Sequence, residues 1–474
     1  MLPARLNSIL AATLGAGLAV TPVAASVSGP DIFGTERLIA KTAPEYRPFV
    51  GVGCELPASQ LTLDRAIDLG LCRNPMTRQA WAAAQAQAAE FGVAEGAYLP
   101  SIALSGSKNR VTGASSAYTL NGSPIDGQNA IAELNWTLLD FGARRSAVDN
   151  ARNLVSAAAH LGSATAQQVV ADVVQAYYGV VANDGAVAAS QQTEANAARS
   201  LEIARALQSG GAASLADVMQ AETAYQQAIY GRIQAANAAK SGRANLAVLL
   251  GFPAEQSLSL APVLAPEAPA VMRRVTDLLT LAAQQRPDLA AARDQRSAAE
   301  AAVTSARAAG RPKISLIAQR DISDYSTQPR QTLNGIGLTV TVPIFTGFQT
   351  HYGIRRAEAA RDQVDAQVEQ ARLRVTLDVW SAYHGLEAAN QELATSAALA
   401  KAAATNEEIA IGRYQAGVGS MLDVLTAQSA GANARLTRIQ TEYNWQSARA
   451  QLALAVGRLA STTDIDTVAP IGAP

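Results

Sequence analysis

The sequence predicts an α+β membrane protein in which a few short β-strands are continued by very long, coiled-coil α-helices. Three observations lead to this fold class. Two helical segments run without a proline for far longer than the helices of ordinary globular proteins. Four short segments alternate apolar and polar residues, as half-buried strands do. The order of these elements then occurs twice along the chain, which indicates two homologous halves.

The beginning of the chain has the features of a secretory signal peptide. Arg5 and the N-terminal amine give it a positive start, Ile9–Val20 is an apolar run too short to span a bilayer, and the small residues up to Ala25 suit cleavage. We therefore assign residues 1–25 to a signal peptide and residues 26–60 to an N-terminal extension. The mature protein is expected outside the cytoplasm.

Charge and hydropathy limit the possible functions. The chain has 38 Lys and Arg residues against 39 Asp and Glu residues, so it lacks the basic surface that nucleic-acid binding requires. After the signal peptide, no segment holds the roughly 20 consecutive apolar residues that a transmembrane helix needs. If the chain crosses a membrane, strands must do so, because only helices and closed barrels satisfy their backbone groups in lipid.

The two cysteines, Cys54 and Cys72, lie near the start of the mature chain. In an oxidising compartment they can form one disulfide. A lipid anchor on Cys54 is an alternative, which its distance from the apolar run disfavours, and two unpaired thiols are another. We predict the disulfide.

The duplication is visible in short motifs that recur at a spacing of 206 residues, and of 212 residues nearer the start of the chain. Residues 214–218 (SLADV) recur as residues 420–424 (SMLDV), and Ala176-Tyr177 recurs as Ala382-Tyr383. Each repeat has the order helix, two strands, very long helix, short break, helix. The predicted boundaries are 61–251 for the first structural repeat, 252–271 for a proline-rich linker, 272–457 for the second structural repeat and 458–474 for a C-terminal tail.

One very long helix is predicted in each repeat, from about Ala143 to Gln208 and from about Thr350 to Gln415. At 1.5 Å per residue each is on the order of 100 Å long. Apolar residues such as Val148, Ala151 and Val155 follow one another in steps of three and four, which predicts coiled-coil packing. The helices alone are equally compatible with a soluble coiled-coil rod.

Two strands are predicted before each long helix, and they distinguish the chain from a plain rod. Alternation is found at 101–106 and 132–138 in the first repeat, and at 314–316 and 336–342 in the second. Apolar residues on one face and polar residues on the other are typical of a membrane barrel wall, and Trp136 suits an interfacial aromatic belt.

The connections between these strands, residues 113–127 and 323–330, are rich in Gly, Ser, Asn and Pro and are predicted to be exposed loops. Four strands cannot close a barrel by themselves, because even small barrels need about eight. Several copies of the chain must therefore share one barrel if the strands lie in lipid.

This pattern resembles the TolC family of outer-membrane factors over about Leu61 to Gly457. The resemblance rests on the order, spacing and duplication of six motifs, at 61–67, 74–75, 97–102, 136–142, 343–347 and 414–425. It implies a trimeric TolC-like channel-tunnel in the bacterial outer membrane: a homotrimer with a shared 12-stranded barrel and helices that cross the periplasm. It also implies a periplasmic adaptor protein and an inner-membrane ABC or proton-driven transporter as partners.

The function that the resemblance implies is a passive, gated duct, with no catalytic residues, cofactor or metal. The three histidines, His160, His351 and His384, have no metal-ligand spacing, and no phosphate-binding loop occurs. The missing lipid-attachment motif and the predicted disulfide favour type I protein (toxin) secretion of the cyclolysin kind. The alternatives are the outer-membrane component of a drug or metal efflux pump, and a periplasmic coiled-coil structural or adaptor protein.

The resemblance also implies a gate at the periplasmic tip. Tyr414 matches a gate tyrosine, Asp217 matches the aspartate that it bonds, and Asp423 matches an entrance aspartate whose three copies would form a cation-favouring ring. Gly419 stands where some members have a linking arginine, and Thr426 replaces a second entrance aspartate, so fewer restraints are expected. Alternatively, Asp217 and Asp423 are helix-start acids stabilised by the helix dipole.

Overall fold

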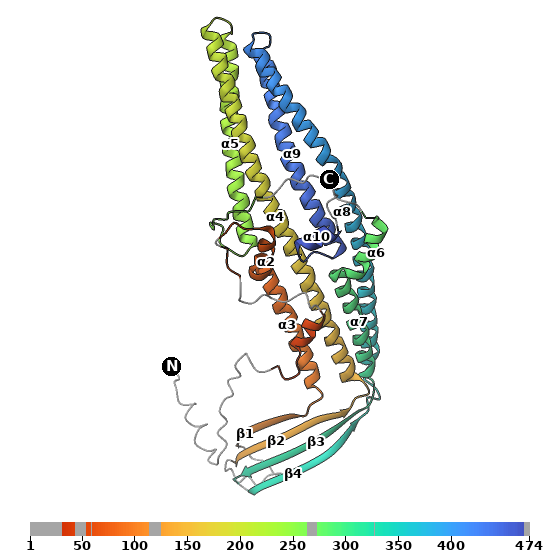
Figure 1. Cartoon of the computed structure of the whole chain (residues 1–474). Coiled ribbons are helices and arrows are strands. Elements are labelled where there is room, and N and C mark those ends of the chain that lie inside the picture. Colours follow the sequence, from red (N-terminus) through yellow and green to blue (C-terminus); the bar gives the residue numbers. More distant parts are fainter. Residues whose placement is uncertain are drawn as a thin grey trace, which may run out of the picture.

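The computed structural model describes residues 31–42, 54–57, 59–112, 125–262, 273–326 and 328–468. The predicted signal peptide lies outside these residues. The described part is an elongated array of helices with a four-stranded sheet at one end (Figure 1). The element order α2-α3-β1-β2-α4-α5 is followed by α6-α7-β3-β4-α8-α9, which is the same order twice.

The two very long helices are confirmed. Helix α4 (Ala143–Ser209) and helix α8 (Gln349–Gln415) have 67 residues each. Each turns back through a short connection into a second helix, α5 (Leu215–Leu249) or α9 (Met421–Val456). The result is two long hairpins that lie side by side and end in two tips (Figure 1).

The shorter helices surround the two long ones. They are α1 (Glu36–Thr42), α2 (Leu63–Arg73), α3 (Pro75–Gly96), α6 (Val275–Gln285), α7 (Pro287–Ala308) and α10 (Thr462–Val468). On the side of the sheet, α3 packs on α4, α4 on α7 and α7 on α8, so these helices form one open layer. None of the helices in the described residues is both long and apolar enough to span a bilayer.

The sheet continues this layer. Strands β1 (Ser101–Val111), β2 (Ile125–Leu139), β3 (Lys313–Tyr325) and β4 (Gln328–Thr341) pair in that order, all antiparallel. Apolar side chains on the sheet are strongly exposed, with Ile336 79% accessible. Such exposure is unusual for a water-facing sheet and is expected of a surface that contacts lipid.

Both predicted loops were too long. The loop predicted at 113–127 ends earlier, because β2 begins at Ile125, and most of the segment predicted as a loop at 323–330 is strand. Polar residues such as Ser323, which pairs with Gln331, continue the ladder. Backbone hydrogen bonds form the ladder whatever the side chains are, so a polar composition does not end a strand.

The main hydrophobic core lies midway along the molecule, where the ends of both hairpins meet α2, α6 and α10 around α4 and α8. Its largest fully buried side chains include Tyr177, Leu246, Leu250, Leu278, Leu386, Trp445 and Leu459. Because this core contains residues from both repeats, neither repeat can bury its apolar surface alone.

In each repeat, the junction between the two short helices before the sheet is hydrogen-bonded to the end of that repeat's own hairpin. Between α2 and α3, Asn74 donates its Nδ2 to the carbonyl oxygen of Leu249 at 2.9 Å. Between α6 and α7, Arg286 donates its Nη1 to the carbonyl oxygen of Ala455 at 3.3 Å. One terminal carbonyl of α5 and one of α9 are thus satisfied by different side chains at equivalent positions.

Gly251 provides a test of the contact between the α2–α3 junction and the end of α5. Its φ is +76°, and a Cβ there would lie 2.7 Å from the carbonyl oxygen of Arg73. We expect Gly251→Ala to destabilise the protein by about 2 kcal/mol, through the left-handed backbone and the close contact. Gly231, which has open space around it within α5, is the control, because alanine there should stabilise the helix by roughly 1 kcal/mol. Equal thermal unfolding temperatures for the two variants would contradict this account.

Candidate functional site

The two hairpin tips bring the predicted gate residues to one end of the molecule (Figure 1). The turns at 210–214 and 416–420 each contain a glycine with positive φ, Gly211 in the first and Gly417 in the second. Next to the turns, a small apolar cluster joins the four long helices. Its buried members are Leu201, Ala204, Val218, Ala221, Tyr414, Met421 and Val424.

Asp217 and Asp423 both occupy the third position of a helical capping box. The Asp217 carboxylate accepts from the backbone N–H and the hydroxyl of Ser214, both at 2.9 Å. The Asp423 carboxylate accepts from the backbone N–H of Ser420 at 3.1 Å. Within one chain, therefore, both acids start helices, as the alternative interpretation expected.

The capping contacts also keep Asp423 charged. Hydrogen bonds from the backbone N–H and then the hydroxyl of Ser420 hold the pKa of Asp423 below its usual value, and the charge of Arg413 adds to this effect. The carboxylate thus stays ionised at lower pH than an ordinary aspartate. Arg413 was not recognised from the sequence as a neighbour of Asp423, because only the fold of the turn brings it close.

Tyr414 lies beside the second turn, as predicted, but its hydroxyl does not make the predicted hydrogen bond. Its side chain is buried, at 6% exposure, and within the described residues its hydroxyl has no hydrogen-bond partner. Burial raises its pKa, and the nearby charge of Asp217 raises it further. The predicted hydrogen bond between Tyr414 and Asp217 is therefore wrong for the single chain. Asp217 lies near but directs its carboxylate to Ser214 instead.

Gly419 packs against the backbone at the end of α8. A Cβ on this residue would lie 3.2 Å from the backbone nitrogen of Tyr414. Any larger side chain at this position would force the turn to shift, because it would contact the end of α8. This conformation of the turn therefore favours glycine. Thr426 lies within α9.

The opposite part of the molecule has two open edges. Within the described residues, β1 and β4 each pair with one strand only, and α3 and α8 lie at the two ends of the helical layer. On α8, the side chains of Leu373, Leu377 and Trp380 form a stripe that is 59%, 61% and 50% exposed. An exposed apolar stripe in water and an unpaired strand edge in lipid are both unfavourable, so each of these edges needs a partner.

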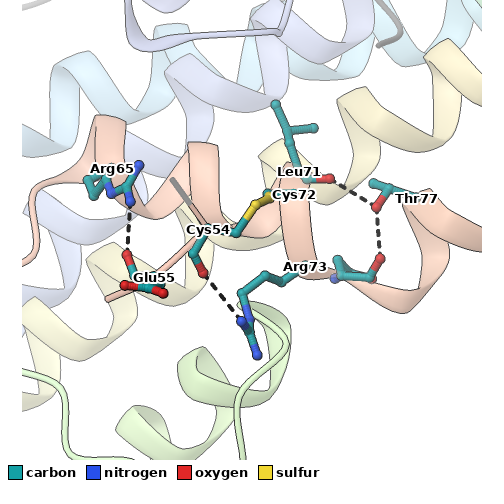
Figure 2. Close-up of a disulfide and its surroundings, with 8 residues drawn as sticks. Cys54, Glu55, Arg65, Leu71, Cys72, Arg73 and Thr77 are labelled. Atoms are coloured by element: carbon teal, nitrogen blue, oxygen red, sulfur yellow. Dashed lines mark hydrogen bonds between the residues drawn. A yellow bond between two sulfur atoms is a disulfide. The ribbon is translucent and has the colours of Figure 1, made fainter. Parts of the chain in front are cut away.

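The predicted disulfide is present between Cys54 and Cys72, with 6.0 Å between the two Cα atoms (Figure 2). It joins the N-terminal extension to α2. Two arginines of α2 hold the same segment: Arg73 donates to the carbonyl oxygen of Cys54 at 3.3 Å, and Arg65 donates to that of Glu55 at 2.8 Å. A sulfur in a disulfide is not available for lipid attachment, which removes the alternative of a lipid anchor on Cys54.

The histidines take part in isolated contacts. His160 lies 3.6 Å from Asp294, and His384 lies 2.9 Å from Glu387. No cluster of three potential metal ligands occurs in the described parts of the chain.

Comparisons with known proteins agree with this architecture. The family model described as "Outer membrane efflux protein" matches residues 66–252 and 278–458. Protein CyaE of Bordetella pertussis is 32% identical over 473 residues, which are 97% of each chain.

Two solved structures have a similar fold at 20% sequence identity. CusC has a TM-score of 0.75, with 84% of this chain and 92% of that chain covered. The outer membrane protein VceC of Vibrio cholerae has a TM-score of 0.72, with 84% of this chain and 96% of that chain covered. The predicted fold class is thereby confirmed.

Proposed function

Because the chain belongs to the outer membrane efflux protein family, we propose that it is the outer-membrane duct of a type I protein secretion system. Proteins of this family are structural outer-membrane channels that reach into the periplasm. They form homotrimers and work with periplasmic adaptors and inner-membrane transporters. In this proposal the chain performs no catalysis, and the partner transporter supplies the energy for export.

The observation that carries the proposal is the similarity to CyaE over nearly the full length of both chains. The disulfide at Cys54 is a second support, because it leaves that residue unlipidated. Export of drugs or metal ions is the second candidate, which the efflux description of the family favours.

A gene deletion separates the two candidates. We expect the deletion strain to retain an exported protein that the parent releases into the medium, with unchanged sensitivity to drugs and metal salts. Unchanged release of protein together with raised drug or metal sensitivity would favour efflux instead. Complementation with the unaltered gene is the control.

We further propose that the tips form the gate, with Asp423 at its entrance. Three copies of this carboxylate around one axis would attract cations and bind multivalent metal ions. The support is the placement of Asp423 at the start of α9 and the contacts that keep it ionised.

Asp423→Ala is expected to weaken the cation preference of the channel and its block by trivalent metal ions. The measurement is the reversal potential in planar bilayers under a salt gradient. Ser420→Ala is the matched control, because it removes the hydroxyl of the capping box and keeps the carboxylate. In the unaltered channel the cation preference should be lost as pH falls through the lowered pKa of Asp423. If Asp423→Ala and the unaltered protein select ions equally, the entrance is elsewhere.

A further inference from the structure

A second set of polar contacts joins the two hairpins at a distance from the tips. Asn196 of α4 donates its Nδ2 to the carboxylate of Glu407 on α8 at 2.6 Å. Arg435 of α9 donates to the other oxygen of Glu407 at 2.9 Å. Gln428 of α9 donates its Nε2 to the hydroxyl of Ser200 at 2.8 Å and to the carbonyl oxygen of Asn196 at 3.2 Å. We call these five residues the polar layer.

The polar layer is buried in a helical interface made largely of small side chains. Glu407 is only 4% exposed. Gly431 of α9 makes room for it, because a Cβ at that position would lie 2.5 Å from the Glu407 carboxylate. A buried charge costs free energy unless it is paired and hydrogen-bonded, and Glu407 has both kinds of partner. Such pairs add little net stability but favour one arrangement of the helices over others.

The contacts divide into two groups. The ion pair of Glu407 with Arg435 lies within the α8–α9 hairpin, so it persists if the hairpin moves as a unit. The hydrogen bonds made with Asn196 and Ser200 connect that hairpin to α4, so they must break if the hairpin moves away from α4. The polar layer therefore restrains the position of the α8–α9 hairpin relative to the α4–α5 hairpin.

Its location separates it from the tips. Asn196 lies about 20 Å along the helix axis from the end of α4, at 1.5 Å per residue. A groove of about 530 Å³ between α4, α5 and α9 runs beside the layer, with Glu407 and Gln428 in its wall.

We infer that the polar layer is a latch that holds the α8–α9 hairpin against α4 and restrains opening of the tips, an inference that rests on the proposed gated duct. The latch is independent of Tyr414, whose hydroxyl is unpartnered within the described residues.

The test is single-channel recording of the full-length protein in planar bilayers. Asn196→Ala removes the bond between α4 and Glu407 and leaves the ion pair of Glu407 with Arg435 in place. We expect the ratio of open to closed channels to rise at least about tenfold, which corresponds to about 1.4 kcal/mol. Gln428→Ala, which removes the hydrogen bonds to Ser200 and to the carbonyl oxygen of Asn196 and leaves the long one from Arg435 to Thr193 at 3.5 Å, should act in the same direction. The mass of the detergent-purified trimer should be unchanged in both.

Glu194→Gln is the matched control. Glu194 lies on α4 close to Asn196 and forms an ion pair with Arg232 of α5, so this contact stays within the first hairpin. Its loss should leave the open fraction unchanged. A general loosening of the helices would instead raise the open fraction of this variant as well, and that result would overturn the latch.

Further outcomes are equally decisive. If Asn196→Ala fails to assemble, Gln428→Ala carries the test, because it breaks hydrogen bonds to α4 and leaves the ion pair of Glu407 with Arg435 in place. Open fractions equal to those of the unaltered channel in the assembled latch variants would overturn the latch and leave the proposed duct standing. An unaltered protein that forms no pore would overturn the proposed duct itself.

Discussion

The double variant Leu377→Asp, Trp380→Asp is expected to behave as a single chain in detergent, where the unaltered protein has the mass of three chains. Both residues are exposed on the edge helix α8, so the substitutions cost little in the isolated chain. In a closed ring the same edge faces the next copy. Placing carboxylates there would bury unpaired charges, which is strongly unfavourable.

The open edges of the layer make this the largest effect that we expect. Strand β1 and strand β4 each lack a partner on one side within the described residues, and unpaired backbone groups are not tolerated in lipid. A ring of copies satisfies both edges at once. Native mass spectrometry or light scattering with detergent correction measures the mass directly.

Thr376→Asp serves as the control for added charge. Thr376 is an exposed residue of the same helix beside the stripe of Leu373, Leu377 and Trp380, and its hydroxyl bonds only to the backbone within α8. This variant should remain trimeric. A trimer formed by the double variant would show that another surface holds the copies together.

Removal of the disulfide is the second large effect. Replacing both Cys54 and Cys72 by serine should destabilise the protein by about 3 kcal/mol, because the bridge closes a short loop with a sequence separation of 18 residues. The unfolding temperature should fall accordingly. The hydrogen bonds that Arg65 and Arg73 donate to this segment remain possible, so the variant should still fold.

Thiol chemistry tests the same bridge independently. The unaltered, denatured protein should show no free thiol until it is reduced, and Cys54 should carry no acyl group. Reduction should lower the unfolding temperature of the unaltered protein to that of the double serine variant, which itself should not respond to the reductant. Two alkylatable cysteines before reduction would reject the bridge.

The sequence by itself determined the long helices almost to the residue. The prediction of Ala143 to Gln208 compares with Ala143–Ser209 in the structure, and that of Thr350 to Gln415 compares with Gln349–Gln415. Helix formation depends on residues three and four apart and on the absence of proline, and both are visible in a linear sequence. The starts of β1 and β3 were also visible, because the alternation of apolar and polar residues predicted at 101–106 and 314–316 is a local pattern. The far ends of the strands were not, since they depend on a neighbouring strand that lies elsewhere in the chain.

The capping role of Asp217 and Asp423 was also accessible, because a serine three residues before an acid is a local signal. The sequence suggested a bond between Tyr414 and Asp217 by resemblance alone. In the folded chain the carboxylate of Asp217 is already engaged by Ser214, so proximity does not produce that bond.

Only the tertiary structure decided that Asn196, Glu407 and Arg435 meet in one buried layer. Each of them stands among polar or charged neighbours in the sequence, where it is indistinguishable from a solvated residue of a helix surface. They come together because α4, α8 and α9 pack in one register, with Gly431 opposite the carboxylate. Local periodicity specifies which face of a helix is apolar, whereas the partner of a buried charge is specified by the packing of helices that are distant in sequence.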